Sequence, residues 1–174
     1  MKYILVDVET YGPCPGIHPL VSIGAINYNT REEFYVELYP DKIEVVNEAF
    51  KIAESALRGG EVLAEKGMKM FYQWLMNQQD KIDDPLIFVS DSTWFDAAFI
   101  NYYMWTYCND NPFGHSSLSL VQLFKGMKKD TRVNIWKLRP EGSHTHNALD
   151  DCRGNVVVLD KLIEQGLKFK KEGK

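Results

Sequence analysis

The chain has 174 residues, of which 45% are hydrophobic and 13% aromatic, and its formal net charge is -4 at pH 7. This length and apolar content predict one globular domain over residues 1–174. We expect a cytoplasmic protein without a membrane partner, because no apolar run approaches the ~20 residues of a membrane helix and no signal segment opens the chain. The acidic charge argues against a protein that coats nucleic acid by electrostatics alone. Three widely spaced cysteines favour free thiols: Cys14, Cys108 and Cys152.

The first predicted element is a strand over Tyr3–Val6, an apolar run typical of a strand covered on both faces. Asp7 and Glu9 follow it, and their i, i+2 spacing points both carboxylates to one side of the strand. Two such carboxylates at ~4 Å repel by about 4 kcal/mol at an effective dielectric near 20, which favours a hard divalent cation between them. The alternative is a pair of solvated acids at a strand-to-loop exit, and the short string D-x-E-T alone does not decide.

The next segments predict a loop, a hairpin and a helix. Residues 11–19 hold three prolines and two glycines and must form an irregular loop. Residues 20–28 and 34–39 are apolar or alternating around a short turn, which predicts an antiparallel hairpin. Residues 42–57 are helical or irregular, and residues 62–76 have apolar side chains at near-helical spacing.

A second acid lies in the middle of the chain. Residues 86–89 predict a strand beside the first, and residues 90–107 predict a helix that follows directly. Asp96 lies one turn before Phe99 and Ile100, which places it on or beside the buried face of that helix. A carboxylate held there needs a partner, whereas an acid that faces solvent would not.

A basic stretch precedes the last helix. Residues 113–118 predict a further strand and residues 120–127 a short helix. Six cations, opposed only by Asp130, then follow within fifteen positions: Lys125, Lys128, Lys129, Arg132, Lys137 and Arg139. Such a run is often a solvated loop, but its place directly before another acidic cluster favours contact with phosphates.

The last cluster lies in the segment H-T-H-N-A-L-D-D, residues 144–151. Asn147 is a candidate helix N-cap, and Asp150 lies in the first turn, where acids are favoured. The predicted apolar face consists of Ala148, Cys152, Val156, Leu159 and Ile163. This phase directs Asp151 inward and Asp150 elsewhere, so the two acids have different roles.

Three segments in this order resemble the motifs of the DEDDh, or DnaQ-like, exonucleases of the RNase H-like superfamily: D-V-E-T at 7–10, W-F-D-A-A-F-I at 94–100 and H-N-A-L-D-D at 146–151. Each motif is weak alone, but their order, spacing and underlying elements make the combination specific. The resemblance covers nearly the whole chain. It implies an α/β protein of RNase H-like fold, with a mixed sheet of about five strands flanked by helices.

The resemblance also implies the site. Four acids carry over as ligands of two divalent ions, Mg²⁺ or Mn²⁺: Asp7, Glu9, Asp96 and Asp151. His146 carries over as the general base, because it precedes the last aspartate by five positions, and His144 misses that spacing by two. Ser92 stands where many members have an asparagine, which puts in doubt how the terminal nucleotide is held. Three residues are expected to border that nucleotide: Thr10, Tyr11 and Phe95.

The implied activity is metal-dependent 3′-5′ exonuclease hydrolysis of single-stranded or short nucleic acid by a two-metal-ion mechanism. The chain looks most similar to oligoribonuclease and ribonuclease T, which makes RNA the first choice and DNA the alternative, as in a proofreading or repair enzyme. Similar short enzymes are often homodimers. A non-catalytic nucleic-acid-binding or polymerase-docking module that kept the fold is the other hypothesis; it predicts erosion of the metal set, and no member of the set is missing.

Overall fold

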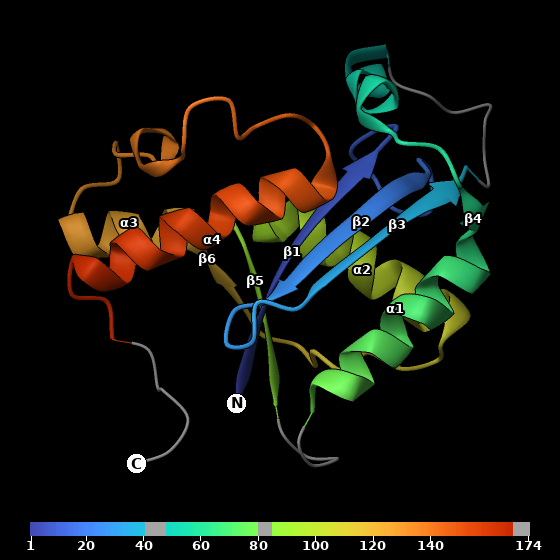
Figure 1. The fold of residues 1–174 in the computed structure, drawn as a ribbon, viewed down its shortest axis with the longest axis horizontal. Coiled ribbons are helices and arrows are strands. Elements are labelled where there is room, and N and C mark those ends of the chain that lie inside the picture. Colours follow the sequence, from blue (N-terminus) through green and yellow to red (C-terminus); the bar gives the residue numbers. More distant parts are fainter. Residues whose placement is uncertain (41–47, 80–84, 169–174) are drawn as a thin grey trace.

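The computed structural model describes residues 1–40, 48–79 and 85–168. Its centre is a mixed six-stranded sheet in the order β4-β3-β2-β1-β5-β6 (Figure 1). The strands are β1 (Lys2–Thr10), β2 (Leu20–Asn27), β3 (Glu33–Tyr39), β4 (Val62–Leu63), β5 (Leu86–Ser90) and β6 (Ser117–Ser119). The pairs β1–β2 and β2–β3 are antiparallel, whereas β3–β4, β1–β5 and β5–β6 are parallel. The predicted α/β class with a mixed sheet is therefore confirmed.

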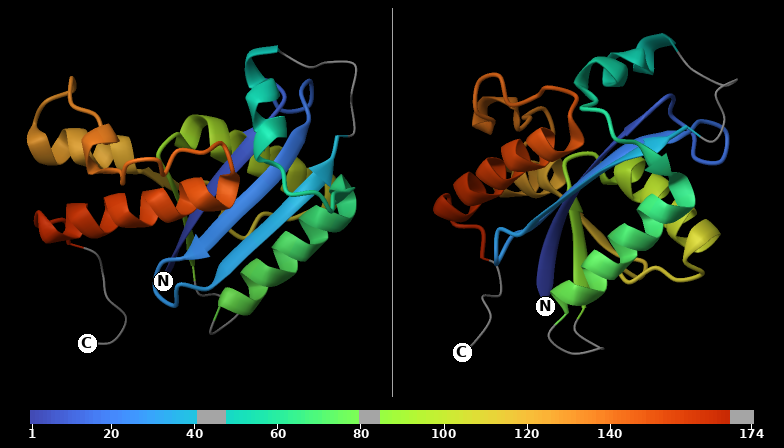
Figure 2. Two further views of the ribbon diagram at one scale, coloured as in Figure 1. Left: turned by 45° about the horizontal axis from the view of Figure 1, so that its top comes forward. Right: turned by 45° about the vertical axis from the view of Figure 1, so that its right-hand side comes forward.

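Helices cover both faces of this sheet. They are α1 (Ala64–Gln78), α2 (Thr93–Tyr107), α3 (Leu120–Lys128) and α4 (Ala148–Glu164), with two 3₁₀ helices, η1 (Glu48–Ala56) and η2 (Trp136–Leu138). Figures 1 and 2 show α1 and α2 on one side of the sheet and α3 and α4 on the other. None of the helices in the described ranges is long and apolar enough to cross a membrane.

Alternation along β1 divides the core in two. Ile4, Val6 and Val8 face the cluster that α1 and α2 complete, whereas Tyr3 and Leu5 face the cluster of α3 and α4. Ile4, Leu5 and Val6 are fully buried, and burying a side chain of this size contributes about 1.5–3 kcal/mol. As its apolar run predicts, β1 is thus a strand covered on both faces.

The structure differs from the sequence prediction mainly at element ends. Val62 and Leu63 form an additional strand, β4, because they pair in parallel with the end of β3. Helix α1 therefore begins only at Ala64. Helix α2 begins at Thr93 rather than Ser90, since Ser90 still pairs with β6. The predicted strand 113–118 is shorter in the structure, where it spans 117–119. Residues 42–47 of the predicted element 42–57 lie outside the described residues.

Phe113 explains why the predicted strand 113–118 is longer than the observed one. Its buried ring packs edge-on against Phe88 of β5 at 5.1 Å between ring centroids, so it contributes to the core from a turn. An apolar residue in a turn has the same hydrophobic signal as one in a short strand. Of the predicted element 42–57, the described part contains η1.

Candidate active site

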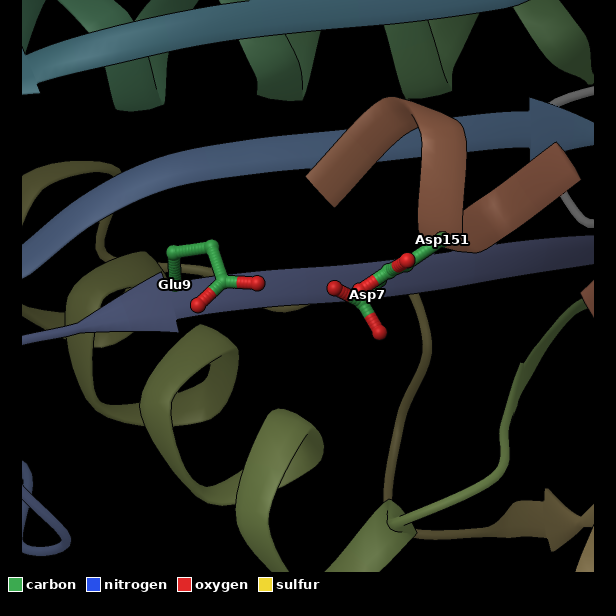
Figure 3. Close-up of side chains that lie close together, drawn as sticks. All are labelled: Asp7, Glu9 and Asp151. Carbon is green, nitrogen blue, oxygen red and sulfur yellow. The ribbon is translucent and has the colours of Figure 1, made fainter. Parts of the chain in front are cut away.

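Asp7 and Glu9 lie near the carboxyl end of β1, on the face that α4 covers. Asp7 pairs in register with Gly24 of β2, and Glu9 with Ser22, so both side chains are held by a paired strand. Asp7 is 9% exposed, and Glu9 is half-buried. Figure 3 shows both carboxylates projecting from β1, with Asp151 of α4 beside Asp7.

Asp151 reaches this place because α4 begins directly over the sheet. The Asn147 side chain caps the helix by accepting hydrogen bonds from the backbone N–H groups of Leu149 (3.2 Å) and Asp150 (3.3 Å). Gly24 leaves the space for this helix start, since a Cβ there would lie 2.3 Å from the backbone carbon of Ala148. As the helix phase predicts, Asp151 is buried, at 1% exposure, and Asp150 is not.

Asp150 has other partners. Its carboxylate pairs with Arg58 at 3.1 Å and with Arg153 of α4 at 2.7 Å. Arg58 also donates to Oδ1 of the Asn147 cap at 3.3 Å. Asp150 therefore belongs to a surface network that supports the helix start, and it is in neither of the carboxylate groups described below.

Asp96 approaches from the opposite face of the sheet, in the first turn of α2. It is 2% exposed, and its Oδ1 accepts a hydrogen bond from the backbone N–H of Val8 at 3.3 Å. Its Oδ2 is buried without a hydrogen-bond partner among the described residues. Burial raises the pKa of Asp96, and a contact with Ser90 offsets only part of that rise. The Ser90 hydroxyl, like Oδ2 of Asp96, is buried without a hydrogen bond of ordinary geometry among the described residues. A buried, unpartnered carboxylate oxygen is costly unless something absent from the chain itself binds it.

These acids form two groups that share Asp7. One group is Asp7, Glu9 and Asp151; the other is Asp7, Asp91 and Asp96. In each group the potential ligand oxygens lie within 4.8 Å of one another. Hard cations such as Mg²⁺ and Mn²⁺ take carboxylate oxygens, so the side chains present fit two divalent ions with Asp7 between them.

The electrostatics fit the same interpretation. Burial, followed by the charge of Asp96, raises the pKa of Asp7 well above its usual range. Burial, followed by the charge of Asp91, does the same to the pKa of Asp96. The pKa of Glu9 rises to about 8, through burial and the charges of Asp151 and Asp96. Without a cation these carboxylates resist ionising together at neutral pH.

The two histidines lie in the loop that leads into α4. The ring centroids of His144 and His146 are 4.4 Å apart, and His146 adopts a left-handed backbone, with φ of 60°. His144, rather than His146, contacts Asp151 directly, with 3.0 Å between Nδ1 and Oδ2. The other oxygen of Asp151 accepts the backbone N–H of Thr145 at 3.0 Å. Burial, and then the charge of His144, lowers the pKa of His146, which keeps its imidazole neutral at pH 7.

The three residues expected to border a nucleotide differ in their access. Thr10 is buried, and its hydroxyl donates to the carbonyl of Gly12 at 2.8 Å. The ring of Tyr11 is buried in a cluster with Val21 and Ala53, so stacking on a base would require it to move. Phe95 is half-buried and packs on Phe99, with 5.2 Å between ring centroids.

Two features of the site escaped the sequence analysis. Asp91 joins the carboxylates, and the signal that could have found it is its place at the end of β5, which runs parallel to β1 and ends at the same edge. Arg139 does not fit the predicted set of phosphate-contacting cations, because its side chain is 3% exposed and pairs with Asp91 at 2.7 Å. That member of the prediction is wrong; Lys128 and Lys129 are exposed, so their assignment remains a prediction.

A family model and several known proteins are similar to this chain. The family model RNase_T, described as Exonuclease, matches residues 4–159. A protein of Escherichia coli named 3′-5′ DNA exonuclease Cap18 is 31% identical to this chain over an alignment of 183 residues. The alignment covers 94% of each protein. The nuclease domain of 3′hExo, described as a DEDDh family member bound to rAMP, has a TM-score of 0.72 at 14% identity and covers 99% of this chain and 96% of that one.

A second solved structure, a zinc-bound complex of E. coli ExoI with single-stranded DNA, has a TM-score of 0.67 at 13% identity. It covers 94% of this chain and 40% of the other. Together these likenesses confirm the expected RNase H-like fold and the resemblance on which it was based. All three motifs lie within the matched residues.

Proposed function

This chain belongs to the DEDDh exonuclease family, and we propose that it hydrolyses single-stranded DNA from the 3′ end in a reaction that requires divalent metal ions. The observation that carries the proposal is the pair of carboxylate groups that share Asp7. A protein that had kept only the fold as a docking module would have no reason to retain mutually repelling buried acids.

The proposed ligands are Asp7, Glu9, Asp96 and Asp151. Ions held there would supply Lewis-acid stabilisation of charge on the scissile phosphate. The chain's part is to fix the ligands: the register of β1 holds Asp7 and Glu9, and the Asn147 cap holds the turn that carries Asp151.

His146 is the proposed general base, which accepts a proton from the attacking water. Its lowered pKa keeps the imidazole neutral at pH 7, as this role requires. His144 is already engaged with Asp151 through Nδ1, so we assign it to orienting that carboxylate. Thr10 and Phe95 are proposed to border the terminal nucleotide.

DNA is proposed ahead of RNA because the relative that is 31% identical over 94% of both chains carries the name of a DNA exonuclease. The sequence-based preference for RNA rested on similarity to other family members, and it has not been confirmed. RNA remains the alternative substrate, because the difference would rest on a few contacts to the 2′-hydroxyl.

The test uses 5′-labelled single strands of DNA and RNA with one sequence, incubated with Mg²⁺ or Mn²⁺. We expect a ladder of products shortened from the 3′ end, formed faster on DNA, and no product from strands with a blocked 3′ terminus. Cleavage in excess EDTA or cuts within a circular strand would contradict exonuclease action. A faster RNA ladder would reverse the choice of substrate only.

A further inference from the structure

Asp91 lies at the carboxyl end of β5, directly after Ser90. Its potential ligand oxygen lies within 4.8 Å of those of Asp7 and Asp96, although Asp91 is outside the three motifs that identify the family. The Asp91 side chain is 21% exposed, so the protein does not enclose it fully. Its backbone is fixed as well, since the Ser119 hydroxyl donates to the Asp91 carbonyl at 3.2 Å.

Arg139 binds the Asp91 side chain through a hydrogen-bonded ion pair. Its Nη2 donates to Asp91 Oδ2 at 2.7 Å and to Asn155 Oδ1 of α4 at 2.5 Å. Both Arg139 and Asn155 are buried. A guanidinium fixed in this way determines the orientation of the carboxylate that it binds.

Two observations show that this arrangement is more than an ion pair of the core. Arg139 engages only Oδ2 of Asp91, while Asp91 still faces two further carboxylates, so one guanidinium stands against three acids. Independently, Asp96 is 2% exposed and its Oδ2 has no hydrogen-bond partner among the described residues. Both the excess negative charge and the unpartnered oxygen would be satisfied by one cation.

We propose that Asp91 is a fifth carboxylate of the metal site, which helps Asp7 and Asp96 to bind one divalent cation, and that Arg139 is the positioning residue that orients Asp91. This inference rests on the metal site of the proposed function and extends it by two residues. The hydrogen bond from Arg139 to Asn155 connects the Asp91 carboxylate to the middle of α4. Asn155 lies four residues after Asp151 in that helix.

The test is a calorimetric titration of Mn²⁺ into the full chain without nucleic acid. Asp91→Asn keeps an oxygen for Arg139 but removes the charge, and we expect it to weaken Mn²⁺ binding by about tenfold or more. Asp130→Asn is the matched control, because Asp130 also pairs with an arginine, at 3.0 Å, but lies in the exposed turn after α3. It should bind Mn²⁺ as the wild type does.

A second pair of variants tests the positioning role. Arg139→Lys keeps a positive donor near Asp91, so it should bind Mn²⁺ more tightly than Arg139→Gln, with melting temperatures recorded for both.

Asp7→Asn separates this inference from the proposed function. If the wild type binds Mn²⁺, Asp7→Asn does not, and Asp91→Asn binds as tightly as Asp130→Asn, then the role of Asp91 is refuted while the proposed function stands. A raised KM for DNA with unchanged Mn²⁺ affinity would also refute it. If the wild type binds no Mn²⁺, the metal site of the proposed function fails, and this inference fails with it.

Discussion

Asp7 is the residue on which the two carboxylate groups depend. It is 9% exposed, it belongs to both groups, and its pKa is raised by burial and then by Asp96. A buried acid among other acids destabilises the folded chain unless a cation or protons neutralise it. The carboxylates should therefore link the stability of the protein both to pH and to metal.

The metal-free protein should lose stability as pH rises from about 4.5 to about 8. Glu9 has a pKa of about 8 in the folded chain, against 4.5 ordinarily, so in this window the folded state retains a proton that the unfolded state releases. The raised pKa values of Asp7 and Asp96 act in the same direction. Melting curves in EDTA at pH 5, 7 and 9 measure this, and Glu9→Gln should make the decline shallower. A melting temperature that climbs across this window would contradict the assignment.

His144 and His146 should differ in their effect on the turnover number. His146→Ala should lower the turnover number by ~10² to 10⁴ and leave Mn²⁺ affinity intact, because it removes a proton acceptor and no ligand. His144→Ala should do much less, although it frees Asp151 Oδ2 from its 3.0 Å contact. Single-turnover rates at saturating metal make the comparison. An inactive His144→Ala beside an active His146→Ala would reverse the two roles.

Asp150 and Asp151 form a second matched pair. Asp151→Asn should abolish activity and weaken metal binding, because its buried carboxylate belongs to the group of Asp7 and Glu9. Asp150→Asn should cost roughly 0.3 to 1 kcal/mol of stability through the helix dipole and keep most of the activity. Its pairs with Arg58 and Arg153 are partly exposed and add little. Activity assays and urea melts of both variants decide.

At the scale of elements, the contact of α4 with β2 positions Asp151. Gly24→Ala would place a Cβ 2.3 Å from the backbone of Ala148, and backbone atoms cannot rotate away as a side chain can. We expect a loss of about 1–3 kcal/mol in the free energy of unfolding, together with weaker Mn²⁺ binding, because the first turn of α4 must shift.

The control for this variant is Gly126→Ala in α3, where no atom lies within 4 Å of the added Cβ. It should stabilise the protein by roughly 0.5–1 kcal/mol, as alanine does for glycine in a helix. Urea melts and Mn²⁺ titrations of both variants measure the effects. Gly24→Ala with wild-type stability and metal affinity would show that the close approach is unimportant.

The sequence predicts elements whose signals are local. The apolar run of β1, the hairpin and the Asn147 cap of α4 lie where periodicity and capping place them. The two residues of β4 are too few for any period to appear, and they are a strand only because β3 lies beside them. Val156, predicted on the inward face of α4, is half-buried, since the sheet covers only part of the helix.

Asp91 and Arg139, which the sequence analysis did not place in the site, are also brought together only by the tertiary structure. The loop after α3 runs back along α4: the Leu138 carbonyl accepts from Lys161, Arg139 meets Asn155, and the Thr145 N–H meets Asp151. Nothing local distinguishes Arg139 from the other cations of its segment, because its partner Asp91 lies 48 positions away in sequence. Only the fold assigns it to the core rather than to phosphates.

At the scale of the molecule, the site lies where several elements meet. The parallel strands β1 and β5 carry Asp7 and Asp91 at or near their carboxyl ends, and the first turns of α2 and α4 carry Asp96 and Asp151. Helix N-termini favour negative charge, so these two helices offset part of the repulsion among the acids. We assign neutralisation of the remaining negative charge to divalent ions.

Metal binding by the shared carboxylates can be seen directly by anomalous diffraction from crystals of the protein grown with Mn²⁺ and a short single-stranded DNA whose last linkage is a phosphorothioate. We expect two Mn²⁺ peaks on either side of Asp7, one beside Glu9 and Asp151 and the other beside Asp96. Absence of Mn²⁺ from these carboxylates while the 3′ end is bound, or Mn²⁺ bound only elsewhere, would contradict this expectation.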